Sequence, residues 1–326
     1  MDRHLHQKIE QKGKCMKKNV RNMNLTRRVS AFLLCAAAVA LLQIVTVPSA
    51  FADAILGSNL STFAILGGAG VAINGTGSVI TGSIGGCCNA TAVTGVIPTN
   101  FNISGGTVQM GGAVAAAAQG ELTSAMTTLG NLNVTNATSV VGGGQTLAPG
   151  VYSSASQMNL TGSLTLDGGS NANALWVFEV GSSLFANNAT VTLTNVGSGA
   201  GVGVFWVMKA GSATLNNTTF VGNVLANQSI SLTGASDTDS CGRLLTQVAS
   251  VTLAGTDTIG IGCSGILLGS NGLSGGGTIT TLPSGAMVVT PLPFAPVPEP
   301  GTVVLVGAGI ACLVARRLRA PASKRL

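Results

Sequence analysis

Side chains that usually carry out catalysis are scarce in this chain of 326 residues. Its two histidines, His4 and His6, lie near the N-terminus, so residues 53–297 offer no Ser-His-Asp or Cys-His triad and no histidine ligand for a metal. Lys209 is the only lysine in that range, and no partner for Ser-Lys catalysis is evident. We therefore expect neither a metal nor another cofactor.

Three aspartates close together in the sequence, Asp237, Asp239 and Asp257, are the remaining catalytic candidates. Two carboxyl groups that flank a sugar could form a glycosidase site. Such a site usually also needs cations or aromatic rings to hold the sugar, and only 4% of the chain is aromatic. We therefore interpret the aspartates as exposed turn residues and expect that the protein is not an enzyme.

Positive charge is concentrated at the two ends of the chain. Nine of the 16 Lys and Arg residues precede residue 53 and five follow residue 315. Residues 53–297 contain two basic and seven acidic residues, which leaves a net charge of −5. A nucleic-acid-binding domain would instead carry a basic patch, so we expect no nucleic-acid partner.

The N-terminal segment has the pattern of a secretory signal peptide. Arg27 and Arg28 precede an apolar run from Ala31 to Val47, and small residues occupy the −3 and −1 positions of a cleavage site after Ala52. We expect signal peptidase to remove residues 1–52 during export through the inner membrane. A membrane anchor is the alternative interpretation.

The C-terminal segment 297–326 combines a proline motif, an apolar stretch and arginines. Pro298, Glu299 and Pro300 precede the stretch 302–315, which as a helix would span about 21 Å, short for a bilayer core of about 30 Å. This order resembles the PEP-CTERM sorting signal of Gram-negative bacteria. The resemblance implies a short transmembrane helix, cleavage near the motif by an exosortase, and secretion or display on the outer cell surface. A permanent tail anchor is the alternative.

The sequence between these ends predicts one β-rich domain over 53–281, followed by a Pro-rich spacer at 282–296. Ser or Thr alternates with apolar residues in five short segments, which begin at Ser163, Thr190, Ser212, Ser229 and Ser250. A period of two is typical of strands with one buried and one exposed face.

These strands also recur in longer units that suggest a β-solenoid. The units close on leucines spaced 31, 17 and 21 residues apart, at Leu184, Leu215, Leu232 and Leu253. Repeats of roughly twenty residues with glycine corners favour stacked coils, and the uneven spacing predicts irregular ones. A β-sandwich is the alternative, although it would need more tight hairpins and more aromatic core.

One segment, 111–130, has helical instead of strand periodicity. Val114, Ala118, Leu122, Met126 and Leu129 follow one another at intervals of four, four, four and three, which predicts an amphipathic helix. Gly130 is suited to its C-terminal cap. Because an apolar stripe must be buried, we expect this helix to lie along one side of the solenoid.

Four cysteines would remain after processing: Cys87, Cys88, Cys241 and Cys263. In an exported protein they are candidates for disulfide bonds. Cys241 and Cys263 are about one coil apart and could join neighbouring coils. Cys87 and Cys88 are adjacent, so they could stay free or pair across molecules. The spacing fits none of the usual zinc patterns.

Residues 60–265 resemble the bacterial and fungal ice-binding proteins that have a discontinuous β-solenoid. The resemblance lies in the order of several segments: Phe63–Gly68, Val79–Gly85, Gln145–Tyr152, Leu160–Asp167, Ala174–Ser182, Val204–Val207 and Thr219–Ala226. It implies a mainly β fold, a right-handed, three-faced solenoid with one long flanking helix.

The same resemblance implies an ice-binding face. In that family one flat face binds ice, often through a loose T-A/G-x-T/N pattern, to which residues 186–190, 216–219, 233–236 and 254–257 correspond here. On this basis the expected face includes Thr190, Thr192, Thr218, Thr219, Thr233, Ser236, Thr256 and Thr258. Asp257 departs from the pattern because it would put a charge on the surface. A ladder of Thr165, Thr214, Ser231 and Thr252 is the next candidate.

Two functions follow from this reasoning. The first is a secreted or surface protein whose partner is the ice crystal and which acts as an antifreeze or inhibits ice recrystallisation. The alternative is a structural protein of the cell surface or biofilm matrix, on the same fold but without ice activity, with an exopolysaccharide matrix as its partner.

Overall fold

The computed structural model describes residues 55–87, 93–95, 101–197 and 201–261, and the backbone of 277–281 and 287–291. The expected signal peptide, sorting signal and transmembrane helix lie outside the described residues, as do Cys88 and Cys263. Contacts divide the chain into residues 1–51 and 52–326, and the features below belong to the second unit.

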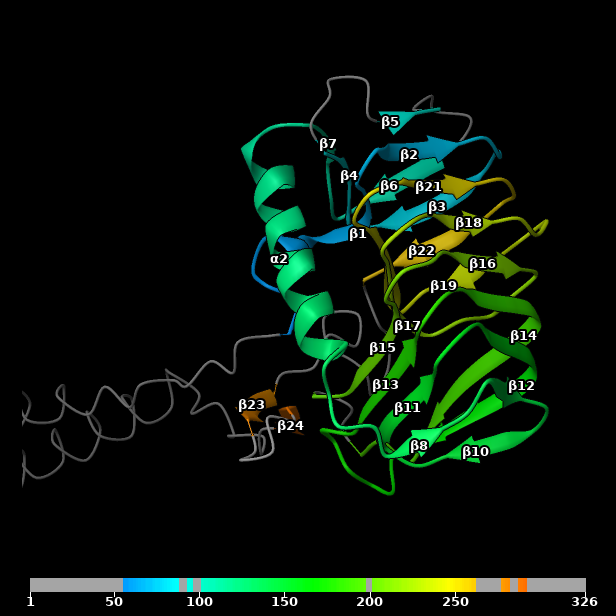
Figure 1. Cartoon of the computed structure of the whole chain (residues 1–326). Helices are drawn as coiled ribbons and strands as arrows, with labels where there is room; N and C mark the ends of the chain where they lie inside the picture. The colour runs from blue at the N-terminus through cyan, green and yellow to red at the C-terminus, as the bar shows by residue number, and fades with distance from the viewer. Residues whose placement is uncertain are drawn as a thin grey trace, which may run out of the picture. The chain divides into compact units, whose positions relative to one another are not determined.

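Parallel strands wind into a solenoid in which each full coil contributes to three faces (Figure 1). Face A is a nine-stranded parallel sheet that consists, in spatial order, of β7 (Val108–Met110), β4 (Ser83–Gly86), β1 (Phe63–Gly67), β20 (Gly242–Thr246), β17 (Gly222–Ala226), β15 (Gly203–Met208), β13 (Leu175–Val180), β11 (Gly150–Ser154) and β8 (Asn136–Ala137).

The strands that follow each face-A strand along the chain form faces B and C. Face B contains β5 (Val93–Thr94), β2 (Gly70–Ile73), β21 (Ser250–Leu253), β18 (Ile230–Leu232), β16 (Ala213–Asn216), the first halves of β14 (Leu184–Thr194) and β12 (Met158–Asp167), and β9 (Val140–Gly142). Face C contains β6 (Phe101–Ser104), β3 (Ser78–Thr81), β22 (Thr258–Gly260), β19 (Thr238–Asp239), the second halves of β14 and β12, and β10 (Gln145–Leu147).

The coils are not stacked in chain order. Ile65 of β1 lies opposite Leu244 of β20, and β2 and β3 pair in the same way with β21 and β22. The N-terminal coils therefore stack on the coil that ends at Gly260, while α2 (Ala113–Leu129) carries the chain along face A toward β8 (Figure 1). Parallel stacking confirms the predicted discontinuous solenoid and excludes the β-sandwich.

The strands β23 (Gly277–Thr281) and β24 (Met287–Pro291) form an antiparallel hairpin. This hairpin crosses the predicted boundary at residue 281. The segment 282–296, predicted to be a stiff Pro-rich spacer, therefore contains a strand.

Inward side chains of successive coils stack in rows that fill the solenoid. The Trp206 ring lies 3.8 Å from that of Phe178 and 4.9 Å from that of Phe220, and all three are buried. Three of the four leucines expected to close the repeats form another row, Leu215, Leu232 and Leu253. Leu184 instead lies opposite Ala213, because its coil reaches that row two residues later.

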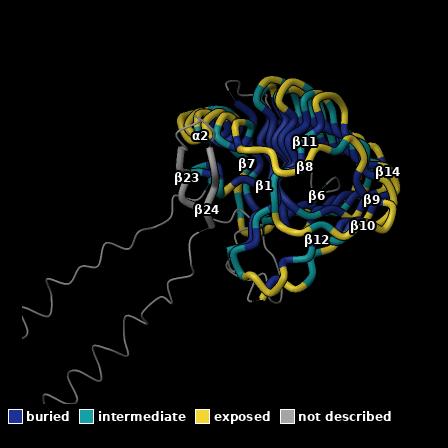
Figure 2. The backbone as a smooth tube through the Cα atoms, turned by 60° about the horizontal axis from the view of Figure 1, so that its bottom comes forward, coloured by how far each residue is buried: buried dark blue, intermediate teal, exposed yellow. Residues whose placement is uncertain are grey.

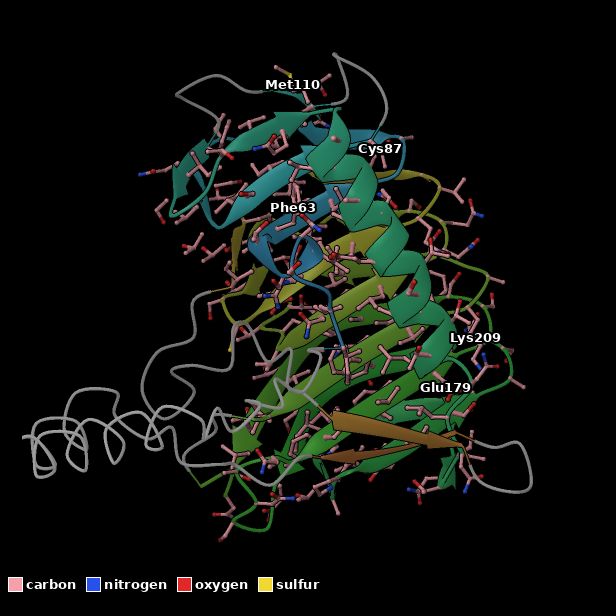
Figure 3. The ribbon with its side chains drawn as sticks, turned by 90° about the vertical axis from the view of Figure 1, so that its left-hand side faces the viewer. Phe63, Cys87, Met110, Glu179 and Lys209 are labelled. Carbon is pink, nitrogen blue, oxygen red and sulfur yellow. The ribbon has the colours of Figure 1, made fainter. Side chains whose placement is uncertain are left out.

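The helix α2 confirms the predicted helix and covers the outer side of face A (Figures 2 and 3). Its buried residues pack against outward apolar residues of face A such as Val177, Phe205 and Leu225. The central strands of face A are thus buried on both sides, which explains why β1, β13 and β15 read as nearly continuous apolar runs. The expected stripe was wrong at Val114, which is 47% exposed, since repeated steps of four drift around a helix and Ala115 takes the buried position.

A short N-terminal segment, residues 55–62, is fastened to both α2 and β20. The Glu121 carboxylate accepts hydrogen bonds from the backbone N–H of Leu60 at 2.7 Å and from the Asn59 side chain at 2.8 Å. Arg243 Nη2 donates to the carbonyl oxygen of Ser61 at 2.8 Å. These bonds fix the start of the first coil to α2 and β20, which come later in the chain.

A buried polar ladder, which we call the corner ladder, runs inside the corner between faces B and C. It consists of Thr218, Asp237, Asp257 and Ser78, one from each successive coil. Asp237 Oδ1 accepts from the Thr218 N–H at 2.7 Å, Asp257 Oδ1 from the Asp237 N–H at 3.0 Å, and Ser78 Oγ from the Asp257 N–H at 3.1 Å. Each side chain therefore fixes its coil to the next.

Burial of these and neighbouring residues corrects two expectations. Asp237, Asp239 and Asp257 are fully buried and are not exposed turn residues. Thr218, expected on the ice-binding face, is also buried, because the chain turns at Asn217, whose φ is 52°, and then points Thr218 toward Asp237.

Replacing Gly120 by Ala should stabilise the protein. Gly120 lies within α2 on its exposed side, and a Cβ there would meet no atom within 4 Å. Glycine costs a helix interior about 1 kcal/mol relative to alanine, so the Tm of Gly120→Ala should rise by about 2–4 °C. Gly57→Ala is the matched control. Its Cβ would displace the Glu121 carboxylate, so its Tm should fall; an unchanged Tm in both variants would contradict this packing.

Burial, reinforced by the neighbouring Asp237 charge, raises the pKa of Asp257 to about 6. The unfolded pKa is about 3.9, so the folded state holds more protons between these values, and the free energy of unfolding falls as pH rises from about 4 to 6. Asp257→Asn keeps an oxygen for the Asp237 N–H but removes the charge. Its Tm relative to wild type should be higher at pH 7 than at pH 4.5, whereas parallel Tm curves would contradict the assignment.

Candidate functional site

Face B presents an unbroken row of uncharged outward side chains across eight strands. Residues directly opposite one another in adjacent strands form this row, in the order Val140, Asn159, Phe185, Thr214, Ser231, Thr252, Ala72 and Thr94. Residues next to them in the chain, such as Leu215 and Leu253, point into the core. Adjacent strands lie about 4.8 Å apart, so the row repeats regularly.

A second row lies two residues further along face B. Thr161, Asn187 and Asn216 are opposite one another, and Asn216 Nδ2 donates to Asn187 Oδ1 at 3.1 Å. The row continues beyond the paired residues through Thr233, Ala254 and Asn74, whose backbone N–H groups bond to the adjacent coil. The predicted residue Thr233 is exposed in this row.

Face C presents a row in which threonine recurs at one position. It runs through Ser163, Thr190, Thr219, Thr238, Thr258, Val79 and Asn102. The predicted residues Thr190, Thr219 and Thr258 all belong to it. Thr192 also lies on face C, opposite Thr165.

Faces B and C differ in continuity and in charge. Every coil from β9 to β5 contributes a strand to face B, whereas one coil reaches face C only through the bridging residue Thr219. Asp167 stands at the edge of face C, where hydrogen bonds from the Gly169 N–H and the Asn195 amide lower its pKa and keep it charged at neutral pH. No charged side chain lies in the two described rows of face B.

The structure does not bring the eight predicted residues onto one surface. Thr190, Thr192, Thr219 and Thr258 lie on face C, Thr233 on face B, and Thr218 in the interior. Ser236 and Thr256 are exposed at the corner between the faces, where Thr256 Oγ1 donates to the Thr76 carbonyl at 2.8 Å. The expected surface charge of Asp257 is absent because that residue is buried.

The residues at the centre of the first face-B row belong to the second set of candidates named from the sequence, the ladder of Ser and Thr residues. Thr214, Ser231 and Thr252 lie in one row as that set requires, while Thr165 belongs to face C. The signal was the alternation of Ser or Thr with leucine in three short strands. Asn159, Phe185 and Ala72 have no such signal, and only the register places them in the row.

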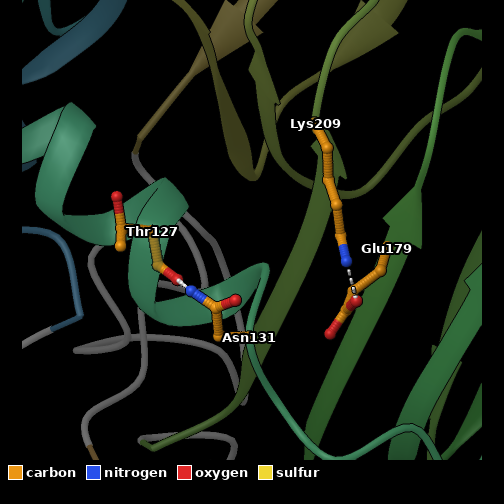
Figure 4. Close-up of polar contacts among 4 residues, drawn as sticks. All are labelled: Thr127, Asn131, Glu179 and Lys209. Atoms are coloured by element: carbon orange, nitrogen blue, oxygen red, sulfur yellow. Dashed lines mark hydrogen bonds and ion pairs between the residues drawn. The ribbon is translucent and has the colours of Figure 1, made fainter.

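Two charged side chains on face A, Lys209 and Glu179, form an ion pair. Lys209 Nζ lies 2.5 Å from Glu179 Oε2, beside the C-terminal end of α2, where Asn131 Nδ2 donates to the Thr127 carbonyl (Figures 3 and 4). The Glu179 side chain is 1% exposed. This pair therefore joins β13 to the residue that follows β15 and offers no carboxylate to a substrate.

A second ionic group is wholly internal. Burial raises the pKa of Asp239 well above its ordinary value although the Arg243 charge opposes this, and Arg243 Nη1 donates to Asn223 Oδ1 at 2.9 Å. Asp237 and Asp257 are engaged in the corner ladder. Among the described residues, no three His, Cys, Asp or Glu side chains are grouped so that they could hold a metal ion.

The described cysteines are both oxidised. Cys87 and Cys241 each take part in a disulfide bond. Cys87 is therefore not a free thiol, which was one of the two fates that the sequence left open for it. Cys263, the expected partner of Cys241, lies outside the described residues, and that pairing stays a prediction. In the described part of the chain, no helix has the length and apolar character needed to cross a membrane.

Comparisons with known proteins agree with this architecture. Residues 65–259 match the Ice-binding-like family, and residues 296–320 match the PEP-CTERM protein-sorting motif. An ice-binding protein from Nostoc sp. (strain HG1) is 36% identical over 195 residues, which cover 59% of this chain and 69% of that relative.

Two solved structures share the fold. The ice-binding protein of the Antarctic ascomycete Antarctomyces psychrotrophicus is 31% identical, with a TM-score of 0.56 over 63% of this chain and 97% of that one. An ice-binding protein from an Antarctic Biological Consortium is 28% identical, with a TM-score of 0.54 over 62% and 89% of the two chains. Because the family match spans more than half of its length and coincides with the solenoid, the chain belongs to the Ice-binding-like family.

Proposed function

We propose that this protein binds ice by adsorbing face B to the crystal surface. The observation that carries the proposal is the row from Val140 to Thr94, which crosses eight strands without a charged side chain. Membership of the Ice-binding-like family supports it. The relatives named above are themselves described as ice-binding proteins.

The chemistry of face B suits a lattice of water molecules. Ice offers a flat, uncharged and repeating surface. Thr214 and Thr252 each present a methyl group, which orders water around it, and a hydroxyl group, which can hydrogen-bond into the lattice. Their branched side chains are stiff and lose little rotational freedom on adsorption. The protein would then pin the ice front, which must curve between adsorbed molecules and stops growing.

Export is the second part of the proposal. Signal peptidase removes residues 1–52, and an exosortase cleaves near Pro298–Pro300, so that the solenoid is secreted or displayed on the outer cell surface. The match of residues 296–320 to the sorting motif supports this route. The protein does not act as an enzyme, since the described acidic residues outside Asp167 are buried or bound to other groups.

Processing can be measured by intact-mass analysis of the protein from its native host. We expect the mature chain to begin after Ala52 and to lack Arg316 and Arg317. A mature protein that retains these arginines would contradict cleavage by an exosortase.

Bulky substitutions on face B should disrupt adsorption without unfolding the protein. Thr214→Tyr and Thr252→Tyr each insert a ring into the centre of the row. We expect ice affinity to fall by about tenfold, or about 1.4 kcal/mol. The free energy of unfolding should change by no more than about 0.5 kcal/mol, as is usual for surface positions.

The measurement is partition of each variant into slowly growing ice, together with its Tm. Thr127→Tyr makes the same change on the exposed side of α2 and should partition like wild type. If the face-B variants also partition like wild type with normal Tm values, face B is not the adsorbing surface. If wild type itself stays in the liquid, ice binding is wrong and a surface or matrix role becomes the better account.

A further inference from the structure

Asn74 is the one asparagine in the two described rows of face B that precedes a glycine. It is exposed in the second row, next to Ala254. An asparagine loses its side-chain amide most readily when glycine follows it, because no side chain shields the next backbone nitrogen. How Asn74 and Gly75 are held decides whether this reaction can occur in the folded protein.

Packing at the corner between faces B and C requires a glycine at position 75. A Cβ on Gly75 would lie 1.9 Å from the carbonyl oxygen of Gly255 in the adjacent coil, so no larger residue fits there. The Gly75 nitrogen lies 3.3 Å from the carbonyl oxygen of Leu253, whereas the Asn74 nitrogen lies 2.8 Å from the same oxygen. The Asn74 N–H therefore makes the better hydrogen bond, and the Gly75 nitrogen is held only weakly.

The Asn74 side chain differs from the other asparagine side chains of face B. Within the described part of the chain, its amide makes no hydrogen bond. By contrast, Asn216 Nδ2 donates to Asn187 Oδ1 at 3.1 Å, and Asn159 Oδ1 accepts from Gln157 Nε2 at 3.4 Å. These three asparagines also precede residues that are larger than glycine. Asn74 thus combines a reactive neighbour with an unrestrained amide.

We propose that Asn74 is a site of spontaneous deamidation. The Gly75 nitrogen attacks Asn74 Cγ, the Cγ–Nδ2 bond breaks, and Nδ2 leaves as ammonia together with the proton of Gly75. The product is a succinimide ring. Water then opens the ring at Cγ to give aspartate, or at the main-chain carbonyl carbon to give isoaspartate. Water is the only co-reactant, and neither step oxidises or reduces an atom.

Either product places a carboxylate on face B, whose rows otherwise consist of uncharged side chains. Ice offers a carboxylate no counter-ion, so adsorption would remove its hydration without compensation. Isoaspartate also adds a methylene group to the backbone of the turn that leads to Ser78, whose Oγ accepts the Asp257 N–H of the corner ladder at 3.1 Å. Deamidation therefore limits how long face B keeps its ice affinity, a consequence that rests on the proposed function.

The reaction can be measured without ice. The purified full chain is incubated in warm, mildly alkaline buffer and digested, and its peptides are assayed for isoaspartate with protein isoaspartyl methyltransferase. The peptide of Asn74 should gain label with time, whereas those of Asn187 and Asn216 should not. Asn74→Gln lengthens the side chain and should leave its peptide unlabelled. The peptides must be separated because Asn271, outside the described residues, also precedes a glycine.

The effect on adsorption is measured by partition into slowly growing ice, with the Tm of each sample. Asn74→Asp should partition about fivefold less than wild type, the lower end of what burial of an unpaired polar group costs. Thr127→Asp is the matched control, which adds the same charge on the exposed side of α2 and should partition like wild type. Aged wild type should lose partition, whereas Asn74→Gln should partition alike before and after ageing.

The outcomes separate the site, its effect and the proposed function. Absence of label at Asn74 in folded protein, or equal labelling of Asn187 and Asn216, would overturn the site. Unchanged partition of both aged, labelled wild type and Asn74→Asp would overturn the loss of ice affinity. If fresh wild type stays in the liquid, the proposed function is wrong, and the labelling experiment still decides whether Asn74 deamidates.

Discussion

The register of parallel hydrogen bonds between coils is the constraint on which the rest of the structure depends. A shift of one residue in any coil would turn its leucines outward and its threonines inward. Inward rows such as Leu215, Leu232 and Leu253 oppose such a shift by packing, and the corner ladder opposes it by hydrogen bonds to Asp237 and Asp257. The regular spacing of the outward side chains therefore depends on the packing and the hydrogen bonds of the interior.

Placement of charge follows from the same constraint. Asp237 and Asp257 join coils from within, Arg243 and Glu121 fasten the N-terminal segment, and the ion pair of Glu179 with Lys209 joins two neighbouring coils of face A. These groups hold together segments that are distant in the sequence. These groups lie in the interior, on α2 or on face A, and the rows of face B consist of uncharged side chains, which suit adsorption to an uncharged lattice.

The sequence predicts the elements better than the surface they form. Alternation in Thr190–Thr194 and helical spacing from Ala118 to Leu129 identify a strand and the helix, since both patterns are local. Corners are not local in this way. Asn188 and Asn217 have positive φ values of 45° and 52°, so two successive residues face outward there and the alternation restarts. Asparagine is frequent throughout these strands, so its presence does not indicate where a corner lies. For this reason the predicted outward position of Thr218 is wrong.

Whether the folded solenoid restrains the growth of ice is the central question. The decisive measurement is recrystallisation of a frozen solution that contains purified residues 53–297, with circular dichroism to verify that the protein is folded. If the solenoid binds ice, the ice grains should stay small during annealing, compared with those in a solution of an unrelated folded protein at the same concentration. Grains that coarsen at the same rate in both solutions, while the solenoid is folded, would contradict it.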